Sequence, residues 1–177
     1  MTRASMRGRV HRTEVAAVAV FVLVLALLAV HAWVAEPFRI PSQSMEPTLR
    51  PGDQVLVDKR AYRDGSPRRG DLVAFTDPKT RDVLLKRVVA LGGDTVGIED
   101  GALVVDGRHV REPYAPPDKI DSVYFGPVRV PRGAVFVLGD NRANSVDSRQ
   151  FGSVPAPRLI GRAVARLWPP GRWGAPD

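Results

Sequence analysis

The chain of 177 residues has no cysteine and only three histidines. The missing cysteine excludes thiol nucleophiles, disulfide bonds and cysteine-ligated metals. Two of the histidines, His11 and His31, lie in or beside an apolar segment near the N-terminus, so only His109 belongs to the rest of the chain. A metal site built on two histidines is therefore excluded there, and a Ser-His-Asp hydrolase would have to use His109.

The sequence also lacks a concentrated basic patch of the kind that binds nucleic acid. Its formal net charge is +7, but much of the excess lies in the first fourteen residues, where four arginines face only Glu14. The other cations are scattered along the chain, so we expect no nucleic-acid partner. With 16 glycines and 16 prolines, the composition favours short strands and tight turns over a helical bundle.

Residues 15–34 form an apolar run without a formal charge. As a helix rising about 1.5 Å per residue, the run matches the ~30 Å hydrocarbon core of a bilayer. The arginines before it predict that residues 1–14 are a cytoplasmic basic tail and that residues 36–177 lie outside the cytoplasmic membrane. The alternative is a cleavable signal peptide ending near Ala32, although the run exceeds the usual ~7–15 apolar residues of such signals.

The remainder of the chain is predicted to be mainly β, with an antiparallel sheet. Asp100-Gly101 and Asp106-Gly107 are each flanked by apolar alternation, which predicts two hairpin turns. Residues 111–127 are rich in proline and aromatics without a period, which predicts a long loop or a small flap. Apolar runs predict strands at residues 55–57, 71–75, 84–91, 95–98, 134–138 and 159–168.

Lys86 stands inside one of these apolar runs, next to Arg87. Alternation along a strand places Lys86 with Val88 and Ala90 on one face and Arg87 on the other, so one of the two cations shares a face with apolar neighbours. A buried lysine without a carboxylate has a lowered pKa, and a neutral lysine can act as a general base. The alternative is a lysine that extends from a strand edge into solvent.

Ser44 lies between Pro41 and Pro47, in a segment with too many prolines for a helix. A stiff loop can present a nucleophile in one geometry. The hydroxyl of Ser42 and the backbone N–H of Ser44 could then stabilise an oxyanion. The alternative is an ordinary Ser-Pro turn.

Residues 139–149 follow a predicted strand and are dense in Asp, Asn, Ser and Arg. Such a composition suits a hydrogen-bond network, in which Ser145 or Ser148 could orient a lysine amine. The alternative is a polar turn with an Asp–Arg pair on the surface.

Together these segments resemble the bacterial type I signal peptidases, also called leader peptidases. Four motifs follow the apolar segment in the order typical of that family. They are Ser44-Met45-x-Pro47-Thr48-Leu49, Gly52-Asp53-Gln54-Val55, Lys86-Arg87 through Gly92-Gly93-Asp94, and residues 139–149.

The resemblance implies a single-pass, membrane-anchored serine endopeptidase with a barrel-like antiparallel β catalytic domain. Such an enzyme removes signal peptides from exported preproteins, cutting after small residues in an Ala-X-Ala pattern. It implies Ser44 as the nucleophile, Lys86 as the general base, and Ser42 with the Ser44 N–H as the oxyanion hole. The expected partners are preproteins and the lipid bilayer, and no metal or cofactor is expected.

The resemblance also implies supporting roles around this dyad. Ser145 would hold the lysine amine, and three charged residues would support the site: Asp140, Asp147 and Arg149. Ile40 and Met45 would form walls of the substrate pockets. The family's smaller second domain is expected to be reduced to residues 111–127.

Two other functions stay open at this point. One is a self-cleaving, repressor-type Ser-Lys peptidase, which the apolar segment and the lack of a DNA-binding module argue against. The other is a catalytically inactive β domain that binds exported peptides or cell-wall components.

Overall fold

The computed structural model describes residues 14–28, 34–63, 65–115 and 124–176. The chain divides into two compact units, Met1–Ala35 and Glu36–Asp177.

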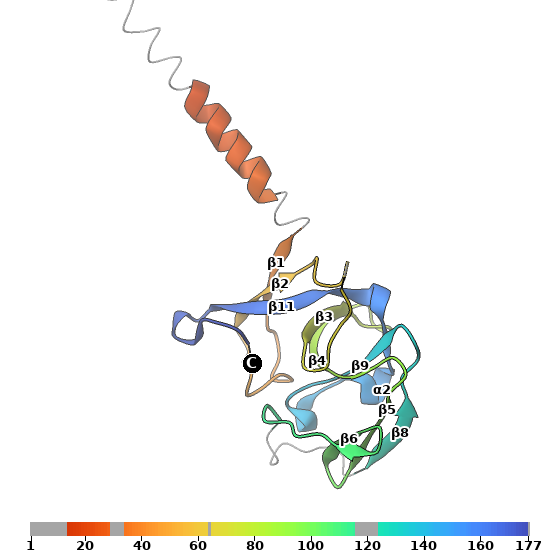
Figure 1. The fold of residues 1–177 in the computed structure, drawn as a ribbon. Coiled ribbons are helices and arrows are strands. Elements are labelled where there is room, and N and C mark those ends of the chain that lie inside the picture. Colours follow the sequence, from red (N-terminus) through yellow and green to blue (C-terminus); the bar gives the residue numbers. More distant parts are fainter. Residues whose placement is uncertain (1–13, 29–33, 64, 116–123, 177) are drawn as a thin grey trace, which may run out of the picture. The chain divides into compact units, whose positions relative to one another are not determined.

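In the first unit, residues 14–28 form a helix (Figure 1). The side chains of this helix are exposed. Within the described ranges, no helix combines the length and the apolar character needed to cross a bilayer. The predicted membrane segment at residues 15–34 includes residues 29–33, which lie outside the described part, as does the predicted tail apart from Glu14. The membrane span therefore stays a prediction.

The second unit is built from two antiparallel sheets, as the mainly β prediction requires (Figure 1). The larger sheet has seven strands in the order β1-β2-β11-β3-β4-β9-β10. Its strands are β1 Ala35–Arg39, β2 Gln54–Asp58, β3 Leu72–Thr76, β4 Val83–Leu91, β9 Ala134–Leu138, β10 Val154–Pro155 and β11 Leu159–Trp168. The predicted strands of this sheet are all present, and β1 and β10 were not predicted.

The smaller sheet has four strands in the order β7-β6-β5-β8. Its strands are β5 Thr95–Glu99, β6 Ala102–Val105, β7 Arg108–His109 and β8 Phe125–Arg129. The two predicted hairpin turns are confirmed. Their central residues all have positive φ, at 49° and 76° in Asp100-Gly101 and at 51° and 72° in Asp106-Gly107, which favours Asp and Gly in such turns.

The smaller sheet overlaps the segment at residues 111–127, and the expectation that the family's second domain is reduced to that segment stays a prediction. The sheet runs from Thr95 to Arg129, and β8 lies partly inside the segment that was predicted to be a loop. Most side chains of β8 are exposed, so the strand has no buried face and no apolar period. Pro127 within β8 fits an edge strand, where a missing N–H is tolerated.

The strand register leaves part of β4 open on one side. β4 pairs with β3 along residues 83–87, but its pairing with β9 begins at Arg87, opposite Leu138. Among the described strands, residues 83–86 therefore have a neighbour on the β3 side only.

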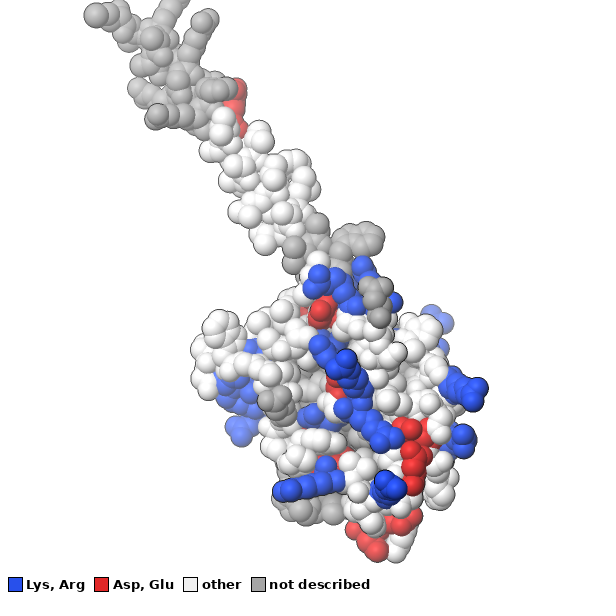
Figure 2. All heavy atoms as spheres, viewed as in Figure 1, with Lys and Arg blue, Asp and Glu red and all other residues white. Residues whose placement is uncertain are grey.

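Short helical turns follow β9, β10 and β11. They are η2 Arg142–Asn144, α2 Ser148–Phe151, η3 Ala156–Arg158 and η4 Pro170–Arg172. On the visible face of the second unit, cations lie close to carboxylates (Figure 2). Two of the ion pairs are Arg69–Asp94 at 2.8 Å and Lys59–Glu36 at 3.3 Å.

Candidate active site

Ser44 lies in the segment between β1 and β2, residues 41–50, which we call the Ser44 loop. The loop is folded into tight turns, because the Leu49 N–H donates to the Met45 carbonyl oxygen at 2.8 Å. Met45 and Leu49 are buried in a core that also contains Val55 and Leu85. These contacts fix the backbone around Ser44, whose side chain is itself 8% exposed.

Lys86 lies in the middle of β4, opposite Val73 of β3, and is 4% exposed. Its Nζ donates a hydrogen bond to Ser44 Oγ at 2.5 Å. Burial lowers the pKa of Lys86 from its ordinary value of 10.5 to about 8, while the carboxylates of Asp147 and Asp140 partly raise it again. An amine with this pKa is half neutral near pH 8 and can accept the proton of a neighbouring hydroxyl.

Ser42 lies on the same loop, and its hydroxyl donates to Ser44 Oγ at 3.2 Å. The structure therefore places Ser42, Ser44 and Lys86 in one hydrogen-bonded group. Ser42 is exposed, whereas Ser44 and Lys86 are buried, so the group lies at the boundary between core and solvent.

The segment after β9 packs against the backbone of Ser44. The Asn141 N–H donates to the Ser44 carbonyl oxygen at 3.1 Å, and Asn141 Nδ2 donates to the Gln43 carbonyl oxygen at 3.2 Å. Gly139 lies in the same contact, where a Cβ atom would overlap with the Ser44 carbonyl oxygen and the Ser145 side chain. Glycine is therefore required at residue 139 for the close approach of these two segments.

Asp140 links β4 to the Ser44 loop through its carboxylate. Arg87 donates to both of its oxygens, from Nε at 2.9 Å and from Nη2 at 2.8 Å. The Thr48 hydroxyl donates to Asp140 Oδ2 at 2.5 Å. All three residues are buried, so the charge of Arg87 is neutralised inside the protein by a paired carboxylate.

Asp147 and Arg149 stabilise the conformation of the segment after β9. Asp147 caps the N-terminus of α2 and accepts the Gly139 N–H at 3.1 Å. Arg149 Nε donates to Asp147 Oδ1 at 2.9 Å, and its Nη2 donates to the Arg142 carbonyl oxygen at 2.7 Å. The structure thus brings both residues to the site, Asp147 by a direct bond to Gly139 and Arg149 by its bonds to Asp147.

Ser145 does not have the contact that was expected for it. Its hydroxyl oxygen is buried and has no hydrogen-bond partner among the described residues, so the expected bond to the Lys86 amine is not formed. The Ser145 side chain lies against the backbone of Gly139. Ser148, the other candidate, instead accepts the Val137 N–H at 3.0 Å.

Arg87 is buried as well as Lys86. Strand alternation predicted that one of the two cations shares a face with apolar neighbours, and the structure encloses both. Arg87 is enclosed by the residue 112–114 segment, because its guanidinium lies 3.9 Å from the centroid of the Tyr114 ring. Glu112 in the same segment accepts from Tyr114 at 2.9 Å and from Arg142 at 2.6 Å. The sequence signal that pointed to these contacts was Arg87 itself, a second cation in an apolar strand.

A small cleft of about 30 Å³ opens beside the contact between Lys86 and Ser44. Ile40 and Met45, the predicted wall residues, both line it. A larger and mainly apolar hollow of about 210 Å³ shares Phe38 and Val83 with this cleft, so the two are neighbours. The other residues of the larger hollow are Glu36, Val57, Ala74 and Ile160.

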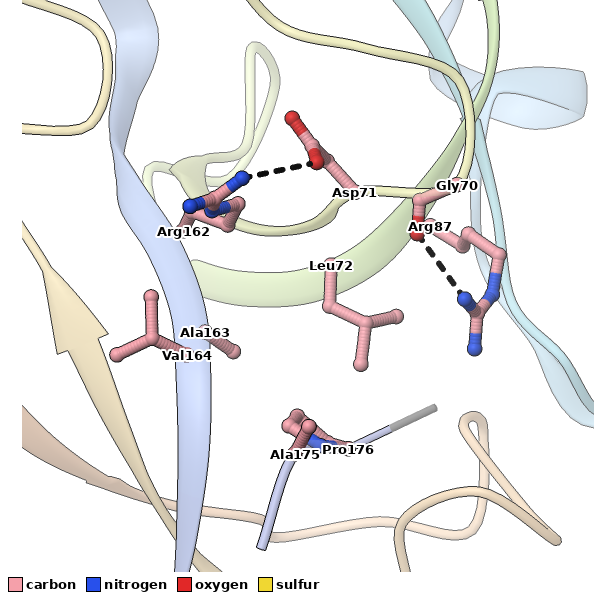
Figure 3. Close-up of a pocket in the computed structure, with 9 residues that line it drawn as sticks. All are labelled: Gly70, Asp71, Leu72, Arg87, Arg162, Ala163, Val164, Ala175 and Pro176. Atoms are coloured by element: carbon pink, nitrogen blue, oxygen red, sulfur yellow. Dashed lines mark hydrogen bonds and ion pairs between the residues drawn. The ribbon is translucent and has the colours of Figure 1, made fainter.

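A separate cavity of about 290 Å³ contains none of the predicted site residues (Figure 3). Arg87 reaches one side of it and donates to the Gly70 carbonyl oxygen at 3.0 Å, while Arg162 lies 3.6 Å from Asp71 on the other side. In the described part of the chain, no three histidine or carboxylate groups converge as metal ligands would.

The chain belongs to the signal peptidases of peptidase family S26, because the family described as "Signal peptidase, peptidase S26" matches residues 12–168. It is 37% identical to signal peptidase I of Mycobacterium tuberculosis, with 97% of this chain and 77% of that protein covered. It is 44% identical to probable signal peptidase I-1 of Synechocystis, with 86% and 80% covered.

A solved structure gives the same assignment. The crystal structure of a signal peptidase I from Enterococcus faecalis superposes with a TM-score of 0.50 at 32% identity, covering 55% of this chain and 97% of that chain. The predicted family is therefore confirmed, and the mainly β fold is that of a signal peptidase.

Proposed function

We propose that this protein is a membrane-anchored serine endopeptidase that removes signal peptides from exported preproteins with a Ser44/Lys86 dyad. The observation that carries the proposal is the contact of Lys86 Nζ with Ser44 Oγ at 2.5 Å. Since burial lowers the pKa of Lys86 to about 8, the amine has a neutral population that can act as a base.

The proposed reaction starts when neutral Lys86 accepts the Ser44 hydroxyl proton. Ser44 Oγ then attacks the carbonyl carbon before the scissile bond, and the Ser44 N–H and the Ser42 hydroxyl stabilise the oxyanion. The Lys86 ammonium returns its proton to the leaving amine as the C–N bond breaks. A water molecule, deprotonated by Lys86, finally hydrolyses the acyl-enzyme and releases Ser44.

The open edge of β4 suits an extended substrate. The pairing of β9 with β4 does not extend to residues 83–86. A peptide can pair with these residues by strand addition. Alternate side chains of an extended peptide point to the same side, roughly 7 Å apart. The two neighbouring hollows that share Phe38 and Val83 therefore suit the residues one and three positions before the cut. The cleft of about 30 Å³ next to Ser44 favours a side chain as small as alanine.

The membrane anchor rests on the apolar segment at residues 15–34. Within the helix at residues 14–28, Glu14 is the only charged residue (Figure 2). A helix that is apolar on every face is typical of a membrane span. We place residues 36–177 on the outer face of the cytoplasmic membrane, since the arginines precede the helix.

Purified protein incubated with a preprotein should release a mature chain whose new N-terminus follows a small residue. Ser44→Ala should abolish this cleavage and keep the circular dichroism of the folded domain. Ser42→Ala should lower kcat about 10²–10³-fold, as loss of one oxyanion donor does elsewhere. Turnover by Ser44→Ala, or no new N-terminus with the wild-type protein, would contradict the proposal and favour the inactive peptide-binding domain.

A further inference from the structure

Two arginines from the C-terminal part of the chain reach the Ser44 loop. Arg166 lies on β11, and Arg172 is the last residue of η4. Arg166 Nη2 donates to the Thr48 carbonyl oxygen at 2.6 Å, and Arg172 Nη2 donates to the same oxygen at 3.0 Å. One backbone carbonyl thus accepts from two charged donors, which bind more strongly than neutral ones.

Asp53 is the carboxylate that keeps these two guanidinium groups together. Arg172 Nη1 donates to Asp53 Oδ2 at 3.0 Å, and Arg166 Nε lies 3.5 Å from the same oxygen. The Arg50 N–H also donates to it at 3.0 Å. Burial, followed by repulsion from Arg172, lowers the pKa of Arg166. Holding two cations on one buried carboxylate is unfavourable by itself, so the arrangement indicates a specific use.

Thr48 connects this group to the rest of the site. Its carbonyl oxygen accepts from the two arginines, and its hydroxyl donates to Asp140 at 2.5 Å. It lies in the same turn as the bond between Leu49 and Met45. Because Met45 follows Ser44 directly, a shift of Thr48 displaces Ser44 from Lys86.

We infer that Arg166 and Arg172, held by Asp53, are positioning residues that fix the Ser44 loop so that Ser44 Oγ stays within reach of Lys86 Nζ. The inference rests on the proposed function of the dyad. The residues act through Thr48 and do not touch the reacting atoms. Losing one of them should therefore slow the chemical step without weakening substrate binding, because an error of about 1 Å in position can cost about 10²-fold in rate.

The test uses the full-length enzyme with Arg172→Ala, since Arg172 is the less buried of the two. We expect kcat to fall about 10²-fold while KM stays within about twofold. The matched control is Arg60→Ala, which removes an exposed arginine paired with Asp58 at 3.3 Å and should leave kcat unchanged. Arg172→Lys should recover part of the loss, because an ammonium still reaches one acceptor.

A second measurement does not depend on turnover. Amide exchange of Leu49, whose N–H closes the loop, should become faster in Arg172→Ala and stay unchanged in Arg60→Ala. Should Arg172→Ala fail to fold, Arg172→Lys and Arg166→Lys are measured instead, with the same expected split between kcat and KM. An unchanged kcat, or a raised KM at unchanged kcat, would overturn the inference and leave the dyad intact. Turnover by Ser44→Ala would instead remove the proposed function on which the inference rests.

Discussion

Lys86 and Arg87 are adjacent on β4, and their side chains have different partners on the two sides of the strand. Arg87 points to the side where a carboxylate contacts it through two hydrogen bonds, to Asp140 at 2.8 and 2.9 Å. Lys86 points to the side where its contact is the neutral hydroxyl of Ser44 at 2.5 Å. Both are buried to a similar degree, at 4% and 5% exposure.

The difference shows that burial alone does not determine the state of a charged group. Desolvation lowers the pKa of Lys86 to about 8, because no carboxylate pairs with it directly. A paired carboxylate compensates the same loss of water for Arg87, whose guanidinium is always charged in proteins. One position therefore suits proton transfer, and the other suits a fixed structural charge.

The largest expected effect comes from Lys86→Met, which removes the unpaired cation. Turnover should fall about 10⁴-fold, since the proposed general base is lost. The free energy of unfolding at pH 7 should rise by on the order of 3 kcal/mol, because the mutant no longer buries a charge whose pKa is shifted from 10.5 to about 8. The unfolded chain holds this proton more tightly, so the gain should shrink as the pH rises from 8 towards 10.5. Urea unfolding at several pH values measures it, and a less stable mutant at pH 7 would contradict it.

Asp140→Asn should have the next largest effect, which is a loss of stability. It leaves the guanidinium of Arg87 buried without its counter-charge, which costs about 3–5 kcal/mol. Asp58→Asn is the control, because it removes the partner of the exposed Arg60 and should cost less than about 1 kcal/mol. Equal losses for the two variants in urea unfolding would show that Arg87 does not need its carboxylate.

The pH dependence of kcat/KM should distinguish the two cations by a smaller effect. Below about pH 8 the logarithm of kcat/KM should fall by about one per pH unit, because Lys86 becomes protonated and can no longer act as a base. In Asp140→Asn the midpoint should move to lower pH, since that carboxylate raises the pKa of Lys86. A peptide substrate without groups that titrate between pH 6 and about 10 is suited to the measurement.

The smallest expected effect is that of Tyr114→Leu, which removes the ring at 3.9 Å from the Arg87 guanidinium. The loss of this cation–π contact should lower stability by about 0.5–2 kcal/mol. The midpoint of the pH profile should stay that of the wild type, because the pKa of Lys86 is set by its burial, Asp147 and Asp140 and not by Tyr114. A shifted midpoint would show that the surroundings of the two cations are coupled.

Much of the fold could be predicted from the sequence, because the patterns that indicate these strands and turns are local. Apolar runs marked the buried strands, and Asp-Gly pairs marked turns that require positive φ. β8 escaped prediction because most of its side chains are exposed, and β1 because Ala35–Arg39 shows no clear alternation. The extent of the smaller sheet depends on pairing between distant segments, such as Thr95 with Arg129, which local patterns do not carry.

For the site, the sequence indicated the residue types but not their contacts. Ser44 and Lys86 were singled out because a serine between prolines and a lysine in an apolar strand are unusual. That Arg87 would be buried with Asp140, and that Ser145 would lie against Gly139, depended on how three distant segments pack. The roles of Thr48, Arg166 and Arg172 were not visible, because they depend on a backbone carbonyl that has no sequence signature.

The contact between Lys86 and Ser44 joins residues 42 positions apart, and the bond from Arg166 to Thr48 joins residues 118 positions apart. Contacts of such separation form only when the whole sheet is assembled. Until then Lys86 is in water with an ordinary pKa and carries its proton. Under the proposed mechanism, a chain that is still folding therefore has no working base.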